Sequence, residues 1–214
     1  MRLYCGYRDW ALKAYDELKR YGFELCTSQE QLNKIDLKKY DFCLLAGWSW
    51  IIPDEMLKKT KFFGVHPSDL PNYRGGSPLQ NQIIDGITKT KCSLFEIAPG
   101  IDKGGIIAKV PISLEGNMPD IFKELTRCTT ELGKHLAEKY PKITITKQGE
   151  GKTLKRRNPN QSKLDPDIFK EDLKKAYDTI RALGDPYPNA YVEDEKGNKL
   201  YFKEVRYEKG EKNV

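Results

Sequence analysis

Short apolar runs alternate with helical patterns over the first two-thirds of the chain. The apolar runs are typical of buried strands and lie at residues 2–5, 42–46, 62–65, 91–97 and 105–112. Apolar residues at helical spacing predict a helix with Asp9 as its cap, and a long helix whose apolar face runs from Ile121 to Leu136. Strands that alternate with helices predict an α/β fold with a doubly wound, mainly parallel sheet.

Proline marks two shorter helices in the same region. Pro53 stands in the first turn of a helix that we expect to end near Lys58. Ser77 is expected to cap a further helix, with Pro78 just inside it. Both helices follow a predicted strand, which fits the alternation of strands and helices.

The pattern changes after Tyr140. A short apolar run at residues 143–145 fits a strand, and the polar residues 149–161 predict a loop. Residues 173–183 then predict a helix. Residues 190–193 and 200–207 predict two strands, joined by a turn at residues 197–198. We therefore expect a core in residues 1–147 and a short C-terminal extension, residues 148–214, packed on that core.

The composition agrees with a packed chain: of 214 residues, 38% are hydrophobic and 32% are charged. No stretch approaches the roughly 18 to 20 apolar residues of a membrane span, and the N-terminus shows no secretory signal. The five cysteines are odd in number and widely spaced, which argues against a disulfide framework and a zinc knuckle. These features favour a protein of the reducing cytoplasm with no membrane contact.

The charge is mildly basic, with 37 Lys and Arg against 31 Asp and Glu and a formal net charge of +6. Ordinary surface lysines and an anionic ligand, such as a nucleotide or a phosphate, both account for this excess. The densest basic run contains no aromatic residue and comprises Lys152, Lys155, Arg156 and Arg157. We therefore expect no nucleic-acid partner.

Ligands of open α/β sheets bind at the carboxyl ends of the strands. Predicted loops occupy such ends at residues 47–50, 66–76 and 100–105. His66 leaves a buried strand into a proline-rich loop, where it is either catalytic or hydrogen-bonded to a neighbouring carbonyl. Asp102 lies in a glycine-rich bend, either as a turn residue or as a partner that orients His66. Trp48 and Trp50 are either core aromatics or a flat wall for a ring-shaped ligand.

Common signatures of other enzyme classes are missing. The only other histidine, His135, lies inside the long predicted helix, where a structural role is expected. The sequence has no G-x-G-x-x-G after the first strand, no P-loop, no G-x-S-x-G and no H-E-x-x-H. A dinucleotide fold, a P-loop enzyme, an α/β-hydrolase and a zinc protease are therefore not indicated, and no metal is implied.

Two segments together resemble the folate-dependent N-formyltransferase family. They read FFGVHPSDLPNYRGGSPLQNQIIDG, from Phe62, and APGIDKGGIIAKVPISL, from Ala98. The family motif is Asn-x-His-x-Ser-Leu-Leu-Pro, then Tyr-Arg-Gly, and later Asp-x-Gly-x-Ile-Ile. The resemblance covers about residues 42–125 and is weaker over residues 176–205. It implies a Rossmann-like core and transfer of a formyl group from the cofactor 10-formyltetrahydrofolate to an amine.

The resemblance assigns roles residue by residue. His66 matches the catalytic histidine of the family, and Asp102 matches the catalytic aspartate. Folate contacts are expected from the loops at the strand ends, at Gly47, Trp48, Ser68, Leu70, Ile97 and Gly100. Asp69 replaces the first leucine of the motif, and Gly64 stands where the family has asparagine. A donor to the reacting oxygen is thereby lost, and we hypothesise that an amide side chain from residues 80–82 replaces it.

Three classes of acceptor amine compete inside the family. They are aminoacyl-tRNA, glycinamide ribonucleotide and a nucleotide-linked amino sugar. We expect the amino group of a nucleotide-linked amino sugar, with glycinamide ribonucleotide or another small amine as the alternative. Family members that act on tRNA have a similar core and a further C-terminal domain. Only seven residues follow Tyr207 here, so we do not expect that domain or a tRNA acceptor. Acceptor contacts are expected at Tyr7, Arg8, Trp10, Arg74, Gln80 and Asn81.

A function of another class, a binding module without catalysis, stays open at this point. Such a module would keep a folate or sugar-nucleotide pocket, and the missing asparagine would account for the lost activity. The presence of both His66 and Asp102 argues against it. The expected partners are thus small-molecule substrates, and exposed strands near the C-terminus are compatible with a homodimer.

Overall fold

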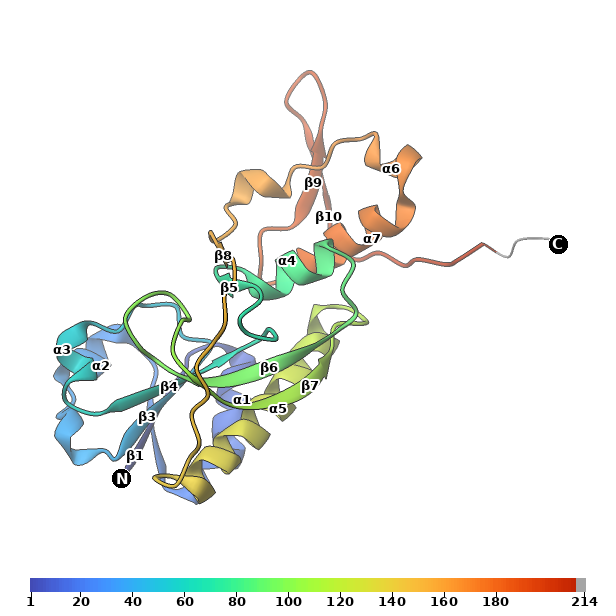
Figure 1. Cartoon of the computed structure of the whole chain (residues 1–214). Helices are drawn as coiled ribbons and strands as arrows, with labels where there is room; N and C mark the ends of the chain where they lie inside the picture. Colours follow the sequence, from blue (N-terminus) through green and yellow to red (C-terminus); the bar gives the residue numbers. More distant parts are fainter. Residues whose placement is uncertain (211–214) are drawn as a thin grey trace.

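A computed structural model describes residues 1–210 and has a six-stranded sheet at its centre (Figure 1). In chain order, its strands are β1 (Arg2–Cys5), β2 (Phe23–Cys26), β3 (Phe42–Ala46), β4 (Lys61–His66), β6 (Lys89–Glu96) and β7 (Ile106–Ser113). Across the sheet the order is β2-β1-β3-β4-β6-β7. The first four strands run parallel, whereas β6 is antiparallel to β4 and to β7. The predicted mainly parallel α/β fold is confirmed.

Helices cover both faces of this sheet. They are α1 (Asp9–Leu18) and α5 (Met118–Lys139) on one face, and α2 (Gln29–Lys34) and α3 (Asp54–Leu57) on the other. Neighbouring residues of a strand point to opposite faces. Tyr4 and Phe42 therefore join the apolar cluster under α1 and α5, while Leu3 and Cys43 join the cluster under α2 and α3.

The order of the strands reverses at β1. The chain runs from β1 to its neighbour β2 on one side and then crosses to β3 on the other. The loops after β1 and β3 leave the sheet in opposite directions at such a switch point, and the crevice between them is where open α/β sheets bind ligands. The sequence places residues 6–8 and 47–53 in these two loops.

Several sequence-based boundaries need correction. α1 begins at Asp9 itself, and its N-cap is Arg8, which makes no capping hydrogen bond with its side chain. Pro53 is the N-cap of α3 rather than part of it. Residues 143–145 form no strand, since only Thr146 makes an isolated bridge, to Ile106. β2 and α2 are additional to the predicted elements: β2 has four residues interrupted by Glu24, and α2 has a single buried residue, Leu32.

Two elements of the C-terminal part pack on the sheet domain. β8 (Thr153–Leu154) pairs in parallel with β5 (Arg74–Gly75), and α7 (Leu173–Ala182) packs against α4 (Pro78–Ile84). It also has its own small apolar cluster, which includes Leu164, Ile180, Leu183 and Ala190. In Figure 1 this part lies beyond α4, away from the central sheet. The boundary between residues 147 and 148 stays a prediction.

The remaining elements are short. They are α6 (Ile168–Glu171), β9 (Ala190–Glu193), β10 (Lys199–Phe202) and the 3-10 helices Lys19–Tyr21, Leu37–Lys39 and Pro159–Ser162. β9 and β10 form the predicted antiparallel hairpin, with Gly197 in a left-handed conformation (φ 82°) at its turn. Over residues 1–210, no helix combines the length and apolarity that crossing a membrane requires.

Candidate active site

His66 is the last residue of β4 and is 7% exposed. Its Nε2 lies 2.8 Å from the carbonyl oxygen of Tyr73, and its Nδ1 lies 3.4 Å from Oδ2 of Asp102. A carbonyl oxygen can only accept a hydrogen bond, so Nε2 carries a hydrogen. Nδ1 in turn faces a carboxylate, which favours a hydrogen on that nitrogen as well. The two contacts together fix the orientation of the ring from both sides.

Asp102 reaches His66 from the bend between β6 and β7. Its backbone is left-handed (φ 51°), a conformation that aspartate tolerates better than most residues. Oδ2 also accepts a hydrogen bond of 2.8 Å from the backbone N–H of Gly75, in the loop after His66. The structure thus brings the two predicted catalytic side chains together, and the carboxylate links their two loops.

Ser68 and Leu70 stabilise the loop that follows His66. The Ser68 hydroxyl donates to the carbonyl of Asn72 (2.6 Å), and the Ser93 hydroxyl donates to the carbonyl of Ser68 (2.7 Å). The N–H of Leu70 donates to the Ser93 hydroxyl (3.2 Å). Ser68 and Leu70 are both 0% exposed. They are therefore not available for the predicted folate contacts and instead hold the loop in shape.

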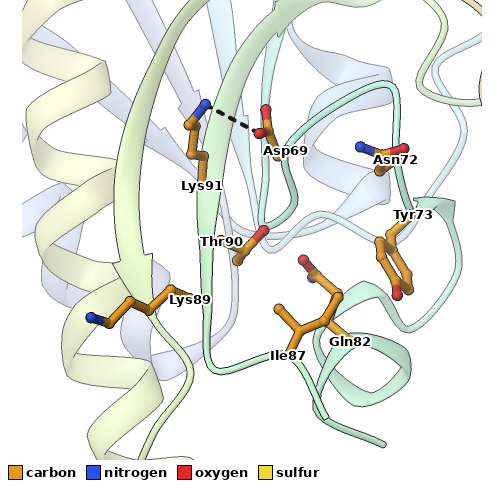
Figure 2. Close-up of a pocket in the computed structure, with 8 residues that line it drawn as sticks. All are labelled: Asp69, Asn72, Tyr73, Gln82, Ile87, Lys89, Thr90 and Lys91. Carbon is orange, nitrogen blue, oxygen red and sulfur yellow. Dashed lines mark ion pairs between the residues drawn. The ribbon is translucent and has the colours of Figure 1, made fainter. Parts of the chain in front are cut away.

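Asp69 turns to the other side of this loop, toward a cavity of about 360 Å³ (Figure 2). It forms an ion pair with Lys91 at 3.2 Å and a second one with Lys109. Partial burial works to raise the pKa of Asp69, but the hydrogen bonds from Lys109 and Lys91 outweigh it and lower the pKa. A charged residue is tolerated at this leucine position because two lysines compensate it.

Gly64 leaves no room for the asparagine of the family motif. A Cβ atom on Gly64 would lie 2.8 Å from Cε1 of Phe95 and 2.9 Å from Cδ1 of Ile97. The ring of Phe95 also meets the ring of His66 edge-on, with centroids 6.3 Å apart. Apolar side chains from β6 and the residue after it therefore fill the space beside His66 that an amide would take.

The amide side chains of α4 do not supply the missing donor. Gln82 donates to the carbonyls of Pro67 (2.8 Å) and Pro78 (2.9 Å), and Asn81 donates to the carbonyl of Gly76 (3.1 Å). Gln80 lies against the C-terminal part of the chain. Our hypothesis of an amide substitute from residues 80–82 is not supported by these contacts.

Aromatic side chains gather at the switch point of the sheet. The Tyr7 hydroxyl lies 2.6 Å from Oγ of Ser49, and the Tyr7 ring is 4.9 Å from the ring of Trp50. The guanidinium of Arg8 lies over the Tyr7 ring at 5.1 Å. Trp50 is 42% exposed. This cluster presents a flat aromatic surface and one cation between the loops after β1 and β3.

Trp48 connects the switch point to the loop of Asp102. It packs in the same apolar cluster as Ile97, which leads into the bend of Gly100 and Asp102. Its indole Nε1 is buried, and no acceptor for it exists among the described residues. Gly47 has a left-handed backbone (φ 61°), and a Cβ there would lie 2.9 Å from Arg8 Cγ. Of the predicted folate contacts, Trp48 and Ile97 thus pack on the same side of the sheet, whereas Gly47 faces Arg8.

Arg74 has a structural role rather than the predicted contact with the acceptor. It is 5% exposed, and its Nε and Nη2 donate to Oε1 of Gln148 at 2.9 and 2.7 Å. Further bonds reach the carbonyls of Gly149 and Gly151. Nε2 of Gln148 donates in turn to the carbonyls of Asp102 (2.9 Å) and Gly104 (2.6 Å).

Gln148 therefore joins the loop of His66 to the bend of Asp102. No motif marked it, because a single glutamine in a polar loop carries no periodic signal. The remaining predicted acceptor residue, Trp10, is partly buried in α1 and packs on the main apolar cluster.

A sequence model of the family described as formyl transferase matches residues 13–140, which is more than half of the chain. A methionyl-tRNA formyltransferase of Listeria monocytogenes is 30% identical over 200 residues. That match covers 88% of this chain and 61% of the relative, so the chain spans about three-fifths of the length of such curated relatives.

Solved structures share the fold over nearly the whole chain. A methionyl-tRNA formyltransferase from Clostridium thermocellum has a TM-score of 0.87 and 33% identity, and the match covers 98% of this chain and 94% of that one. A sugar N-formyltransferase from a Shewanella species has a TM-score of 0.77 and 17% identity, with 98% of each chain covered. The family match and the shared fold agree with the paired His66 and Asp102, and the chain belongs to the formyl transferase family.

Proposed function

We propose that the chain transfers a formyl group from 10-formyltetrahydrofolate to the amino group of a nucleotide-linked amino sugar. The observation that carries the proposal is the His66–Asp102 pair at the carboxyl end of β4, 3.4 Å apart and beside the switch point. Membership of the formyl transferase family supports the reaction class. A binding module without catalysis is disfavoured, because such a module needs no paired histidine and aspartate with both partners held by hydrogen bonds.

The residues beside His66 fit a folate. The indole Nε1–H of Trp48 is a buried donor that needs an acceptor, and the acceptor nitrogens and oxygens of a pteridine ring provide such atoms. Ile97 and the indole of Trp48 form an apolar wall of the kind that a flat ring system requires. Gly47 and Gly100 have positive φ angles and leave the wall free of side chains at two turns.

When bound, 10-formyltetrahydrofolate supplies an electrophilic formyl carbon. His66 donates a hydrogen bond to the oxygen on which negative charge develops, after its Nε2–H turns from the Tyr73 carbonyl. Asp102, 3.4 Å from Nδ1, orients the ring. As the bond from the amine to the formyl carbon forms, Asp102 or a water would accept the proton that the amine loses. As the bond from the formyl carbon to the folate nitrogen breaks, that same proton would pass to the departing nitrogen.

Tyr7, Arg8 and Trp50 support an acceptor with a ring and a negative charge. An aromatic surface stacks on a nucleobase or a sugar, and a guanidinium binds phosphate oxygens. No contact in the structure supports acceptor binding by Trp10, Gln80 or Asn81, so these roles stay predictions. Location in the cytoplasm and a homodimer also stay predictions.

A second acceptor is favoured by one observation. The relatives with 30% and 33% identity are named methionyl-tRNA formyltransferases, whereas the sugar N-formyltransferase from Shewanella is 17% identical. Formylation of an aminoacyl-tRNA would overturn our expectation of no nucleic-acid partner.

The test measures release of tetrahydrofolate from 10-formyltetrahydrofolate with one acceptor at a time. The acceptors are a panel of nucleoside-diphosphate-linked amino sugars, glycinamide ribonucleotide and methionyl-tRNA. We expect turnover with an amino sugar, and none in the His66→Ala variant. Turnover with methionyl-tRNA alone would replace the acceptor and keep the reaction, and no turnover with any acceptor would refute both.

A further inference from the structure

Two buried donors without acceptors lie in one small cavity, between α4 and the C-terminal part. The cavity holds about 40 Å³ and is lined by Ser77, Gln80, Arg157, Ser162, Leu183 and Tyr187, among others. The donors are Nε2 of Gln80 and Nε of Arg157. Unpaired buried donors are rare in folded proteins and each costs about 1–3 kcal/mol.

Gln80 lies on the opposite side of α4 from the active-site loop. Gln82, two positions later and therefore roughly 200° around the helix, reaches the carbonyl of Pro67 next to His66. Gln80 points instead toward the C-terminal part, is 4% exposed, and has no acceptor for Nε2 within residues 1–210. Its side chain is thus held in the cavity with its donor unused.

Arg157 brings a positive charge to the same cavity. Its Nη2 donates to the carbonyl of Gln161 (2.6 Å), and its backbone N–H donates to Oγ of Ser77 (3.1 Å). In the described part of the chain, Arg157 takes part in no ion pair, and Nε has no acceptor. Burial lowers the pKa of Arg157, since the site disfavours its unneutralised charge.

The polar groups around the cavity leave an acceptor missing. The Ser162 hydroxyl already donates to the carbonyl of Pro188 (2.9 Å). The Ser77 hydroxyl accepts from Arg157 and keeps its own hydrogen free for another acceptor. Gln80, Arg157 and Ser77 therefore bring donors to a lining that also includes Asn158, Leu183, Tyr187 and Pro188.

We propose that this cavity binds a small oxyanion, a carboxylate or a phosphate group, between Arg157 Nε–H and Gln80 Nε2–H. A guanidinium and an amide are strong donors for such oxygens. The size of the cavity admits one such group, either free or at the end of a larger molecule, and the group would join α4 to residues 157–162. This proposal is independent of the proposed function. Its test measures anion binding by thermal unfolding and needs no formyl transfer.

The experiment follows thermal unfolding of the full chain at fixed pH with sodium phosphate, sodium acetate or sodium chloride at matched ionic strength. A ligand that binds only the folded state raises Tm as its concentration rises above Kd. We expect phosphate, acetate or both to raise Tm beyond the effect of chloride. A nucleoside monophosphate then tests whether the phosphate must be free. An effect equal to that of inorganic phosphate indicates that the cavity accepts a phosphate at the end of a larger molecule.

Matched variants locate the effect. Arg157→Gln and Gln80→Leu should each weaken the apparent affinity at least tenfold, whereas Arg156→Gln, the same charge change at an exposed neighbour, should change it less than twofold. If Arg157→Gln does not fold, Gln80→Leu carries the test. No effect beyond chloride, or equal losses in Arg156→Gln and Arg157→Gln, would show an adventitious ion only. Unchanged anion affinity in Gln80→Leu would likewise refute the site.

Discussion

His66 and Asp102 form the pair on which the proposed chemistry depends. Each is held by a second contact, His66 to the Tyr73 carbonyl and Asp102 to the Gly75 N–H. These contacts come from one loop, residues 73–75, so the loop after β4 orients both members of the pair. Side chains fixed in this way lose little freedom when a substrate binds.

We expect His66→Ala and Asp102→Asn each to lower turnover by about a hundredfold or more, because the first removes a hydrogen-bond donor and the second a carboxylate charge that the proposed transition state needs. Asparagine at position 102 keeps the left-handed backbone and isolates the loss of charge. Steady-state kinetics with the accepted amine measure the effect, and thermal unfolding checks the fold. His135→Ala, on α5, is the control and should keep full turnover. Near-normal rates in either active-site variant contradict the assignment.

Gly64→Asn should not restore a better enzyme. The new side chain meets Phe95 and Ile97 within 3 Å, and overpacking of this kind costs about 1–3 kcal/mol. Urea unfolding should show a lower midpoint and turnover should not rise. The double variant Gly64→Asn with Phe95→Ala should recover part of the stability. A stable single variant with higher turnover would show that the space beside His66 is adaptable.

At the scale of elements, the loop after β4 and the bend between β6 and β7 are held together from outside the sheet. Gln148 accepts from Arg74 and donates to the carbonyls of Asp102 and Gly104. It lies after α5, and thus outside residues 13–140 that match the family model. The geometry of the pair therefore depends on a segment beyond the matched region.

Gln148→Ala should lower turnover roughly tenfold to a hundredfold, since small displacements of catalytic groups have effects of this size. It is a positioning residue, so we expect kcat to fall more than KM changes. Lys147→Ala, its exposed neighbour, serves as the control. A loss of stability with an unchanged kcat would assign Gln148 a purely structural role.

Asp69 links the same loop to β6 and β7 through Lys91 and Lys109. Its pKa in the folded chain lies below the ordinary value of 3.8, so the unfolded state binds a proton first as the pH falls. The stability that the charge contributes is therefore present above about pH 4 and is lost as the pH falls through the folded pKa. Asp69→Asn should therefore have a lower Tm than the unmodified protein, by the same amount from about pH 5 to 8. This difference in Tm should shrink below pH 3.8.

Asp167→Asn, which removes an exposed ion pair with Lys170, is the control for this titration. It should change Tm little at any pH. An Asp69→Asn effect that grows toward low pH would contradict the ion-pair account.

At the scale of the whole molecule, the sheet domain and the C-terminal part share contacts instead of standing apart. α7 packs on α4, β8 pairs with β5, and Arg181 donates to the carbonyls of Leu114 (2.5 Å) and Gly116 (3.0 Å). Leu79 and Ile83 of α4 belong to the main apolar cluster, so α4 contacts both parts.

A chain that ends at residue 147 should unfold at a clearly lower temperature than the full chain. The truncation removes the partner of Arg74, the strand that pairs with β5 and the helix that covers α4. Buried polar groups such as the Arg74 guanidinium would lose their acceptors, which is costly. Circular dichroism melting measures the difference, and an unchanged melting temperature would mean that residues 1–147 are an independent domain.

The sequence by itself determined the central strands at residues 2–5 and 42–46 and the long helix, and its family motif named His66 and Asp102, whose contact the structure supplied. Periodic burial and a two-part motif are local signals, so they can be read without knowing which segments meet. Only the tertiary structure decided that Phe95 fills the space beside Gly64, that Arg74 binds Gln148, and that Gln80 faces Arg157. Each of these depends on a contact between segments distant in the chain, and hydrogen-bond acceptors are chosen by proximity in space, which no local pattern records.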